Sequence, residues 1–541
     1  VGNRWRNLQD MARTPLFGFF ARALRSATLA NRHGVPIDEL PELQRSNQKG
    51  KLGRRKFLKR TAYSAGTMLA VGSQACRNSR VGQANNTPKI AIVGAGIAGL
   101  NAAYQLKLAG YHATIYEASS RVGGRMYTVS DTVGEKIWVN LGAEYINSDH
   151  DDMIALAAAL DIPLLDRFTP EELALQNLYF FDGRTLSEAE LGEALLPVAE
   201  RIAADADRLE EDWENVSVEL DALSIADYCD RLGLSGWLRA FIETAMIAEM
   251  GLEVDEITAL NLLWLMPTTD ADGSIKATGK SDERYLVQNG TQAITDALAQ
   301  AVQNQIETGM ALTAIRHRGN RFRLTFNDSD VDADIVILAL PFSVLRQIPL
   351  QLDLPASLRK FIDEVGYGHN VKVATGYHSP IWREQGLSGA GYSDRPYQTF
   401  VETTQLQPTA AKSLTFYLGG DIGFDSQRYS VRKHARMYTQ MLDDLMPGLA
   451  AAWNGKATRL HWPTHRYALG SYACWKPRQY TEFMQDYIYF EGAEEQEFAV
   501  GNLIFAGEHT SDAHQGYMNG AAQSGRLAAK AVLSRLGSLA S

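Results

Sequence analysis

The feature that most constrains this chain is a glycine-rich turn that follows a short apolar run. The run Ile90 to Val93 ends at a glycine, which is typical of a buried parallel strand. Gly94, Gly96 and Gly99 then form GxGxxG and lead into a predicted helix over 98–108. The first glycine allows a tight turn, the second lets the backbone approach a pyrophosphate, and the third lets helix and strand pack closely. Since a helix N-terminus also attracts phosphate, the pattern predicts a dinucleotide site.

Two motifs downstream indicate which dinucleotide is bound. A second strand is predicted over 111–116, and Glu117 follows it at the distance where a carboxylate accepts hydrogen bonds from ribose hydroxyls. That carboxylate disfavours a 2′-phosphate, so NADP is not expected. In the segment RVGGR, Gly124 lets a second loop approach the cofactor, and Arg125 can place a guanidinium on the pyrophosphate. This second motif favours FAD over NAD.

With GxGxxG, the glutamate and RxGGR in this order, the chain resembles the flavin-containing amine oxidase family. That family includes monoamine oxidases, polyamine oxidases, L-amino-acid oxidases and lysine-specific histone demethylases. Residues 502–510 (NLIFAGEHT) and 515–521 (QGYMNGA) are also similar to its C-terminal flavin signature. The resemblance spans about 88–536, is strongest at both ends, and is weak through 150–280.

The resemblance implies an α/β fold. A Rossmann-like FAD domain of the glutathione-reductase type would be interleaved with an α+β substrate domain. The helical pattern from residue 151 to about 277 is too long for a loop and favours a separate lobe. The expected FAD domain comprises 88–146, 284–345 and 495–541, and the expected substrate domain comprises 147–283 and 346–494.

Further cofactor contacts are implied by the family. The loop 140–145 would lie beside the isoalloxazine, a backbone group at Leu312 would bind adenine, and the carboxylate after the last strand would bind ribityl or ribose hydroxyls. The helix beginning near Met518 would point its N-terminus at the flavin pyrimidine, where negative charge grows on reduction. The residues concerned are Gly142, Ala143, Leu312, Gly507, Glu508 and Met518.

Ser471 stands where mitochondrial monoamine oxidases carry the cysteine that is linked to flavin. A serine cannot form that thioether, so the FAD is expected to be non-covalent. Cys474 lies nearby but is out of register. The three cysteines of the chain contain no CxxC pair, so neither a disulfide framework nor a zinc site is expected.

Three residues are predicted to carry the chemistry. Lys372 matches the family lysine whose ammonium holds a water against flavin N5, and a lysine inside an apolar strand is costly unless it is paired or lines a wet cavity. Tyr472 and Tyr517 match the family's two aromatic rings, which flank the substrate nitrogen by apolar and cation–π contact. The alternatives are a strand-edge surface lysine and two core tyrosines.

The substrate class is less constrained. Animal L-amino-acid oxidases carry a carboxylate-binding arginine where this chain has Tyr145. An amino-acid substrate would need another cation, for which Arg478 and Lys476 are candidates. Glu144 is either a partner for a cationic substrate or a structural carboxylate.

These residues favour an FAD-dependent amine oxidase. It would convert a primary amine to an imine, then to aldehyde and ammonia, and reduce O2 to H2O2. The alternative is an L-amino-acid oxidase that gives a 2-oxo acid, ammonia and H2O2. Two further classes are a flavoprotein dehydrogenase or desaturase that reduces a quinone and a flavoprotein without catalysis. The lysine and the aromatic pair argue against the latter. The net charge of −10 argues against nucleic acid as a partner.

The first 87 residues carry their own signals. The segment GRRKFLK (53–59), followed by a mildly apolar stretch over 61–71, resembles a twin-arginine export signal, so a periplasmic or extracellular enzyme is expected. Residues 51–87 are therefore assigned to the signal-like segment and a polar linker. Within residues 1–50, an amphipathic helix starting at Thr14-Pro15 would contact either an anionic membrane surface, this protein or a second subunit.

Overall fold

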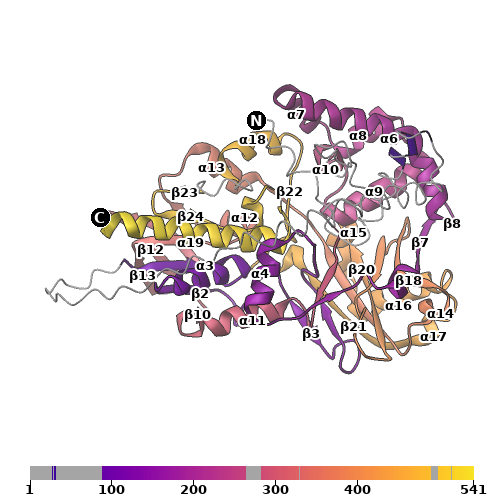
Figure 1. Ribbon diagram of the computed structural model, residues 1–541, viewed down its shortest axis with the longest axis horizontal. Helices are drawn as coiled ribbons and strands as arrows, with labels where there is room; N and C mark the ends of the chain where they lie inside the picture. Colours follow the sequence, from indigo (N-terminus) through magenta and orange to yellow (C-terminus); the bar gives the residue numbers. More distant parts are fainter. Residues whose placement is uncertain are drawn as a thin grey trace, which may run out of the picture.

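The computed structural model describes residues 88–263, 282–327, 329–488, 498–512 and 514–540, together with Ala27, Thr28, Ala30, Asn31 and Gly34. The predicted amphipathic helix, the signal-like segment and the linker lie outside the described residues. Two lobes are visible in Figure 1, one around a mostly parallel sheet and one that combines an antiparallel sheet with helices. This is the α/β architecture with an α+β lobe that the sequence predicts.

The first lobe is built on a six-stranded sheet of order β10-β2-β1-β14-β24-β23. The first five strands are parallel, and β23 runs antiparallel at the edge. The strands are β1 (Ile90–Val93), β2 (Ala113–Glu117), β10 (Ile306–Thr308), β14 (Ile335–Leu338), β23 (Ala499–Val500) and β24 (Leu503–Phe505). Three distant stretches of the chain thus build one sheet, because β1 pairs with β14 and β14 pairs with β24.

Helices α3 (Ile97–Leu108) and α19 (Met518–Ala540) pack against each other (Figure 1). A Cβ on Gly525 would lie 2.2 Å from the carbonyl oxygen of Ala98, so only glycine permits this approach. Helices α4 (Asp151–Ala159) and α11 (Gln292–Ala301) pack against α19 and α3, respectively. The GxGxxG helix is therefore held by the C-terminal end of the chain.

The second lobe contains a seven-stranded sheet of order β21-β17-β20-β19-β18-β7-β8. Its central strands are buried, and β17 is buried along its whole length. The strands are β7 (Gln176–Phe181), β8 (Arg184–Leu186), β17 (Val371–Tyr377), β18 (Leu387–Ser393), β19 (Thr399–Glu402), β20 (Lys412–Leu418) and β21 (Trp453–His461).

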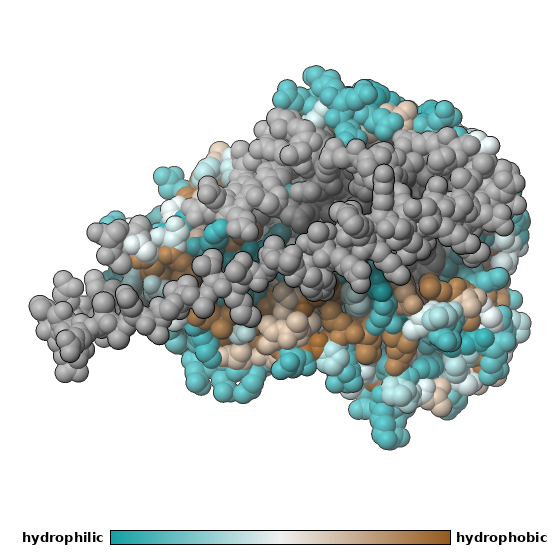
Figure 2. Space-filling model, in the orientation of Figure 1, coloured by the Kyte–Doolittle hydropathy of each residue, from teal (hydrophilic) through white to brown (hydrophobic). Residues whose placement is uncertain are grey.

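A helical layer belongs to the same lobe and appears in magenta in Figure 1. It comprises α6 (Glu188–Glu211), α7 (Trp213–Asp221), α8 (Ile225–Leu232), α9 (Gly236–Met250) and α10 (Leu260–Leu263). Helices α6 and α8 begin with capping boxes at Ser187 and Ser224, which satisfy free N–H groups of the first turn. The outside of this layer is largely hydrophilic in Figure 2, and its inward residues join the largest core cluster.

The prediction of a helical pattern from residue 151 to about 277 was wrong between the helices. The structure places β6 (Leu164–Asp166), β7 and β8 there. Strand β7 pairs in parallel with β18, which follows it by about two hundred residues. Such pairing is decided by distant partners, so the local helical pattern on either side did not reveal it.

Shorter elements complete the fold. The smaller sheets are formed by β3 (Thr128–Ser130) with β4 (Trp138–Asn140); β5 (Tyr145–Ile146) and β6 with β9 (Tyr285–Val287); β11 (Leu312–Arg318), β12 (Arg321–Phe326), β13 (Ser329–Ala333) and β15 (Leu350–Gln351); and β16 (Gly366–Tyr367) with β22 (Ala473–Cys474). The remaining α-helices are α5 (Pro170–Leu173), α12 (Phe342–Leu345), α13 (Ala356–Glu364), α14 (Ile381–Glu384), α15 (Gly420–Asp425), α16 (Val431–Asp443), α17 (Leu449–Ala452) and α18 (Gln479–Tyr487).

A short N-terminal piece contacts the helical layer. Ala27 and Ala30 are buried, and the Asn31 side-chain amide donates to the carbonyl oxygen of Leu196 in α6 at 2.9 Å. The chain near residue 30 therefore docks on this protein. Among the described residues, no helix is both long and apolar enough to cross a bilayer.

Candidate active site

One cavity of about 600 Å³ extends from the glycine-rich turn of the first lobe to the sheet of the second. All but one of the residues predicted to bind the cofactor or to carry the chemistry line it. They are Gly94, Gly96, Glu117, Gly124, Arg125, Gly142, Ala143, Leu312, Lys372, Tyr472, Gly507, Glu508, Tyr517 and Met518. Gly99 lies beneath the cavity wall, where a Cβ would come within 2.0 Å of the carbonyl oxygen of Gly94.

The glycine-rich turn presents its own backbone to the cavity, so a ligand can approach the main chain directly. Gly94 has φ +103°, and a Cβ there would lie 2.6 Å from the carbonyl oxygen of Ala339. A Cβ on Gly96 would meet no protein atom within 4 Å, so this face is open for a phosphate. The Glu117 carboxylate accepts from the backbone N–H groups of Ala95 (2.8 Å) and Ser119 (2.9 Å). It therefore anchors the turn as well as bordering the cavity.

The RxGGR loop packs directly on this turn. A Cβ on Gly124 would lie 3.2 Å from Cα of Gly96. Gly142 makes a second close approach, since a Cβ there would come within 1.9 Å of the carbonyl oxygen of Arg125. The three loops thus fit together only through glycine, and they leave a narrow cradle rather than a packed core.

An ion pair joins Arg125 of the RxGGR loop to Glu508 after the last strand, and the two side chains are 24% and 5% exposed. Nη1 of Arg125 donates to Oε1 of Glu508 at 2.7 Å and to the carbonyl oxygen of Ser471 at 2.8 Å. Glu508 also accepts from the backbone N–H groups of Ala473 (3.1 Å) and Gly516 (2.8 Å). Burial alone would raise the pKa of Glu508, but the charge of Arg125 and these hydrogen bonds hold it below its ordinary value.

Lys372 and Glu144 form a second buried ion pair. Nζ of Lys372 donates to Oε2 of Glu144 at 2.6 Å and to the carbonyl oxygen of Asn140 at 3.3 Å. The side chains of Lys372 and Glu144 are 11% and 4% exposed. Lys372 is therefore a paired residue of the cavity wall and not a strand-edge surface lysine.

The cavity that this pair lines is also lined by Tyr417, Tyr472 and Tyr517. The hydroxyls of Tyr417 and Tyr472 lie 3.0 Å apart, and the Tyr472 hydroxyl donates to the carbonyl oxygen of Glu249. The Tyr417 ring lies 5.7 Å from Nζ of Lys372. Tyr517 packs edge-on against His150, with ring centroids 4.9 Å apart. Tyr472 and Tyr517 thus line the same cavity but are held by different neighbours.

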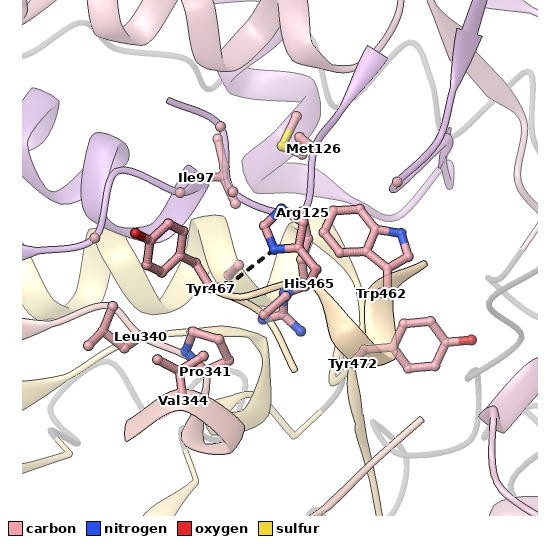
Figure 3. Close-up of a pocket in the computed structure, with 18 of the residues that line it drawn as sticks. Ile97, Arg125, Met126, Leu340, Pro341, Val344, Trp462, His465, Tyr467 and Tyr472 are labelled. Carbon is pink, nitrogen blue, oxygen red and sulfur yellow. Dashed lines mark hydrogen bonds between the residues drawn. The ribbon is translucent and has the colours of Figure 1, made fainter. Parts of the chain in front are cut away.

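Figure 3 shows the cavity wall around Arg125. The rings of Trp462 and Tyr472 lie on one side of the view, and Leu340, Pro341 and Val344 lie on the other. Trp462 donates through Nε1 to the carbonyl oxygen of Leu141 at 2.9 Å, which fixes its ring beside the loop over 140–145. A ligand here would touch mainly carbon atoms and a few fixed polar groups.

Two predicted candidates lie elsewhere. Arg478 is the exposed N-cap residue of α18, and Lys476 pairs with Glu256 at 2.9 Å; neither lines the cavity. Sequence reasoning missed Tyr417, which reaches the site from β20. That strand carries no recognisable motif, and only the sheet register against β17 places Tyr417 directly opposite Lys372.

The cavity fits a non-covalent dinucleotide. Its glycine cradle, its ribose-side carboxylate Glu117 and the half-buried Arg125 match the parts of FAD. Ser471 reaches the wall and donates to Oδ1 of Asn370 at 2.7 Å. Cys474 is buried, and no cysteine among the described residues lines the cavity, so the described part offers no thiol to the flavin. Within that part no cluster of three or more His, Cys, Asp or Glu residues could hold a metal.

One lobe provides the cofactor cradle, and the second lobe provides aromatic walls of the same cavity. This arrangement defines a two-lobed flavoprotein. The chain belongs to the flavin containing amine oxidoreductase family, which matches residues 97–533. It is a flavin-dependent oxidase whose cofactor is FAD, held without a covalent bond.

Known proteins of two kinds are similar to it. A flavin-containing amine oxidase of Danio rerio is 24% identical over 480 residues, which cover 84% of this chain and 87% of the relative. An L-amino acid dehydrogenase of Synechocystis is 23% identical over 82% of this chain and 94% of the relative. The structure of cyclohexylamine oxidase from Brevibacterium oxydans superposes with a TM-score of 0.70 at 20% identity and covers 83% of this chain and 99% of that one.

Proposed function

We propose that this enzyme oxidises a primary amine to an imine, which hydrolyses to an aldehyde and ammonia, and that O2 is the electron acceptor and gives H2O2. One observation carries the proposal: Lys372, Tyr472 and Tyr517 line the same cavity as the FAD cradle. FAD, when bound, accepts the hydride equivalent that a C–N oxidation releases.

The side chains of the cavity provide binding, orientation and exclusion of water. The rings of Tyr472 and Tyr417 are fixed through their hydroxyls, so they offer a rigid apolar wall to an alkyl or aryl amine. The ammonium of Lys372 is fixed between Glu144 and the carbonyl oxygen of Asn140, which positions it to hold a water with its remaining N–H. Because this part of the cavity is buried, the reacting carbon is shielded from bulk water.

Tyr145 also favours an amine over an amino acid. It stands where a carboxylate-binding arginine would be needed. The guanidinium of Arg167 stacks over the Tyr145 ring, with Cζ 4.5 Å from the ring centroid. Arg167 donates to Gln405 and to the carbonyl oxygen of Glu283 and does not line the cavity. This arginine therefore does not replace the missing carboxylate-binding one.

The test is H2O2 release by the purified, FAD-loaded enzyme with tyramine, phenethylamine and putrescine set against L-Phe, L-Leu and L-Lys. We expect turnover of amines. Turnover of L-amino acids alone would refute the amine proposal in favour of an L-amino-acid oxidase. Amine oxidation with a quinone but without H2O2 would refute O2 as the acceptor.

A second experiment tests Lys372. We expect Lys372→Met to slow reoxidation of the reduced enzyme by O2 at least about 100-fold, the lower end of what a positioned proton-transfer group contributes. The rate is followed by flavin absorbance after anaerobic reduction with dithionite, so no amine is needed. Unchanged reoxidation would refute the role of Lys372.

A further inference from the structure

The charged side chains of the cavity wall are almost all committed to protein partners. Glu117 accepts two backbone N–H groups, and Arg121 donates to the carbonyl oxygens of Val122 and Gly124. Arg125 is paired with Glu508. Arg466 is exposed, with its guanidinium over the ring of Tyr467 at 5.3 Å. Among the described residues that line the cavity, this leaves Lys372 and Glu144 as the remaining buried charges.

The pairing of these two groups is asymmetric. Oε2 of Glu144 accepts from Lys372 at 2.6 Å, whereas Oε1 is buried and has no hydrogen-bond partner within the described part of the chain. The neighbouring Tyr145 hydroxyl is likewise buried and lacks a partner there. Buried polar atoms normally have partners, so both point to a ligand that this wall is built to receive.

We propose that Glu144 is the specificity-determining residue of the substrate pocket: it withholds Lys372 from carboxylates through Oε2 and offers Oε1 to the substrate's ammonium or amine N–H. The proposal rests on the proposed amine-oxidising function and names the charge of the substrate. With Glu144 in place, the charge of Lys372 is neutralised, and Oε1 of Glu144 remains as a buried charged acceptor without a partner in the described part of the chain. Without Glu144, the same wall would present an unpaired ammonium, which suits a carboxylate.

Binding of two matched probes to the FAD-loaded enzyme tests this without turnover. Benzamidine is a planar cation with N–H donors, and benzoate is an anion of nearly the same shape. Affinities are measured by calorimetry and by the change in flavin absorbance. We expect wild type to bind benzamidine more tightly than benzoate. In Glu144→Gln we expect benzamidine to weaken about 10- to 100-fold, the usual range for a hydrogen bond to a charged group, and benzoate to tighten.

Two variants serve as controls. Glu256→Gln breaks the Lys476–Glu256 pair, which has the same chemistry but lies outside the cavity, and should change neither affinity. The double variant Glu144→Gln/Lys372→Met removes both charges, so it should prefer neither probe. If Glu144→Gln alone loses FAD, the double variant is compared with wild type instead, because it contains no unpaired buried ammonium.

The outcomes separate this proposal from the function on which it rests. Equal affinities for both probes in wild type, or benzamidine affinities within twofold in wild type and Glu144→Gln, would overturn the role of Glu144. Benzoate binding as tight in the double variant as in the single one would also overturn it, because Lys372 would not be the carboxylate's partner. If probe preference switches as expected while no amine is oxidised, the pocket assignment stands and the proposed function fails.

Discussion

Removing the guanidinium of Arg125 tests whether its ion pair with Glu508 stabilises the fold. In Arg125→Met, the Glu508 carboxylate keeps its two backbone N–H donors but loses its counter-ion. The Glu508 side chain is only 5% exposed. Breaking a buried pair on one side costs about 3–5 kcal/mol. With about 2.1 cal/mol/K of unfolding entropy per residue, this corresponds to a loss of about 3–4 °C in Tm for a chain of this size.

The pH dependence of this loss gives the sharper test. In wild type the pKa of Glu508 is held below its ordinary value, so the pair contributes stability above that value and loses it as the pH falls through the folded-state pKa. In Arg125→Met burial is no longer opposed by Arg125, and the pKa of Glu508 should rise. The carboxyl group then takes up a proton on acidification and the cost of the unpaired charge disappears. The difference in Tm between the two proteins should therefore shrink between pH 7 and pH 5.

The assay is thermal unfolding in excess FAD, followed by flavin fluorescence at several pH values. Arg184→Met is the control, because Arg184 and Glu190 form a pair in which both side chains are 48% exposed, and such surface pairs contribute at most about 1 kcal/mol. A Tm difference that stays constant from pH 7 to pH 5, or a loss no larger than that of the control, would refute the reasoning.

Three further outcomes are expected. Gly99→Ala should weaken FAD binding at least about 10-fold in a fluorescence titration, because the new Cβ would overlap the carbonyl oxygen of Gly94 and must displace the turn. In the control variant Gly537→Ala the new Cβ meets open space, so FAD should bind normally. Burial lowers the pKa of His509 to about 4, so on acidification from pH 6.5 the unfolded chain gains a proton that the native protein does not take up. In urea unfolding, the free energy of unfolding of wild type should therefore fall by about 2 kcal/mol more than that of His509→Gln between pH 6.5 and 5. Equal losses in the two proteins would contradict this. Acid precipitation should release all FAD into the supernatant, and flavin retained in the pellet would contradict non-covalent binding.

The parts of the site that were predictable from sequence are those set by local spacing. Gly94, Gly96 and Glu117 line the cavity because a strand, a tight turn and a helix fix their separation, whatever the rest of the chain does. Leu312 and Met518 were identified only through resemblance to the family, and both line the cavity.

The parts that were not predictable depend on contacts between distant segments. Glu144 and Lys372 are 228 residues apart, and their pairing requires the loop after β4 to close over β17. Tyr417 faces the cavity because β20 pairs with β17 in one particular register. A shift of one residue would turn it to the other face of the sheet, and no local pattern specifies that choice.

The order of the strands also has a consequence for biosynthesis. The cofactor sheet joins β1 to β14 and then to β24, a strand more than 400 residues after β1. Glu508, Tyr517 and α19 all come later still in the chain. A ribosome-bound chain therefore cannot hold the flavin until the residues up to α19 have been released from the ribosome. Products truncated before β24 should lack bound flavin and would be recognisable by their missing yellow colour.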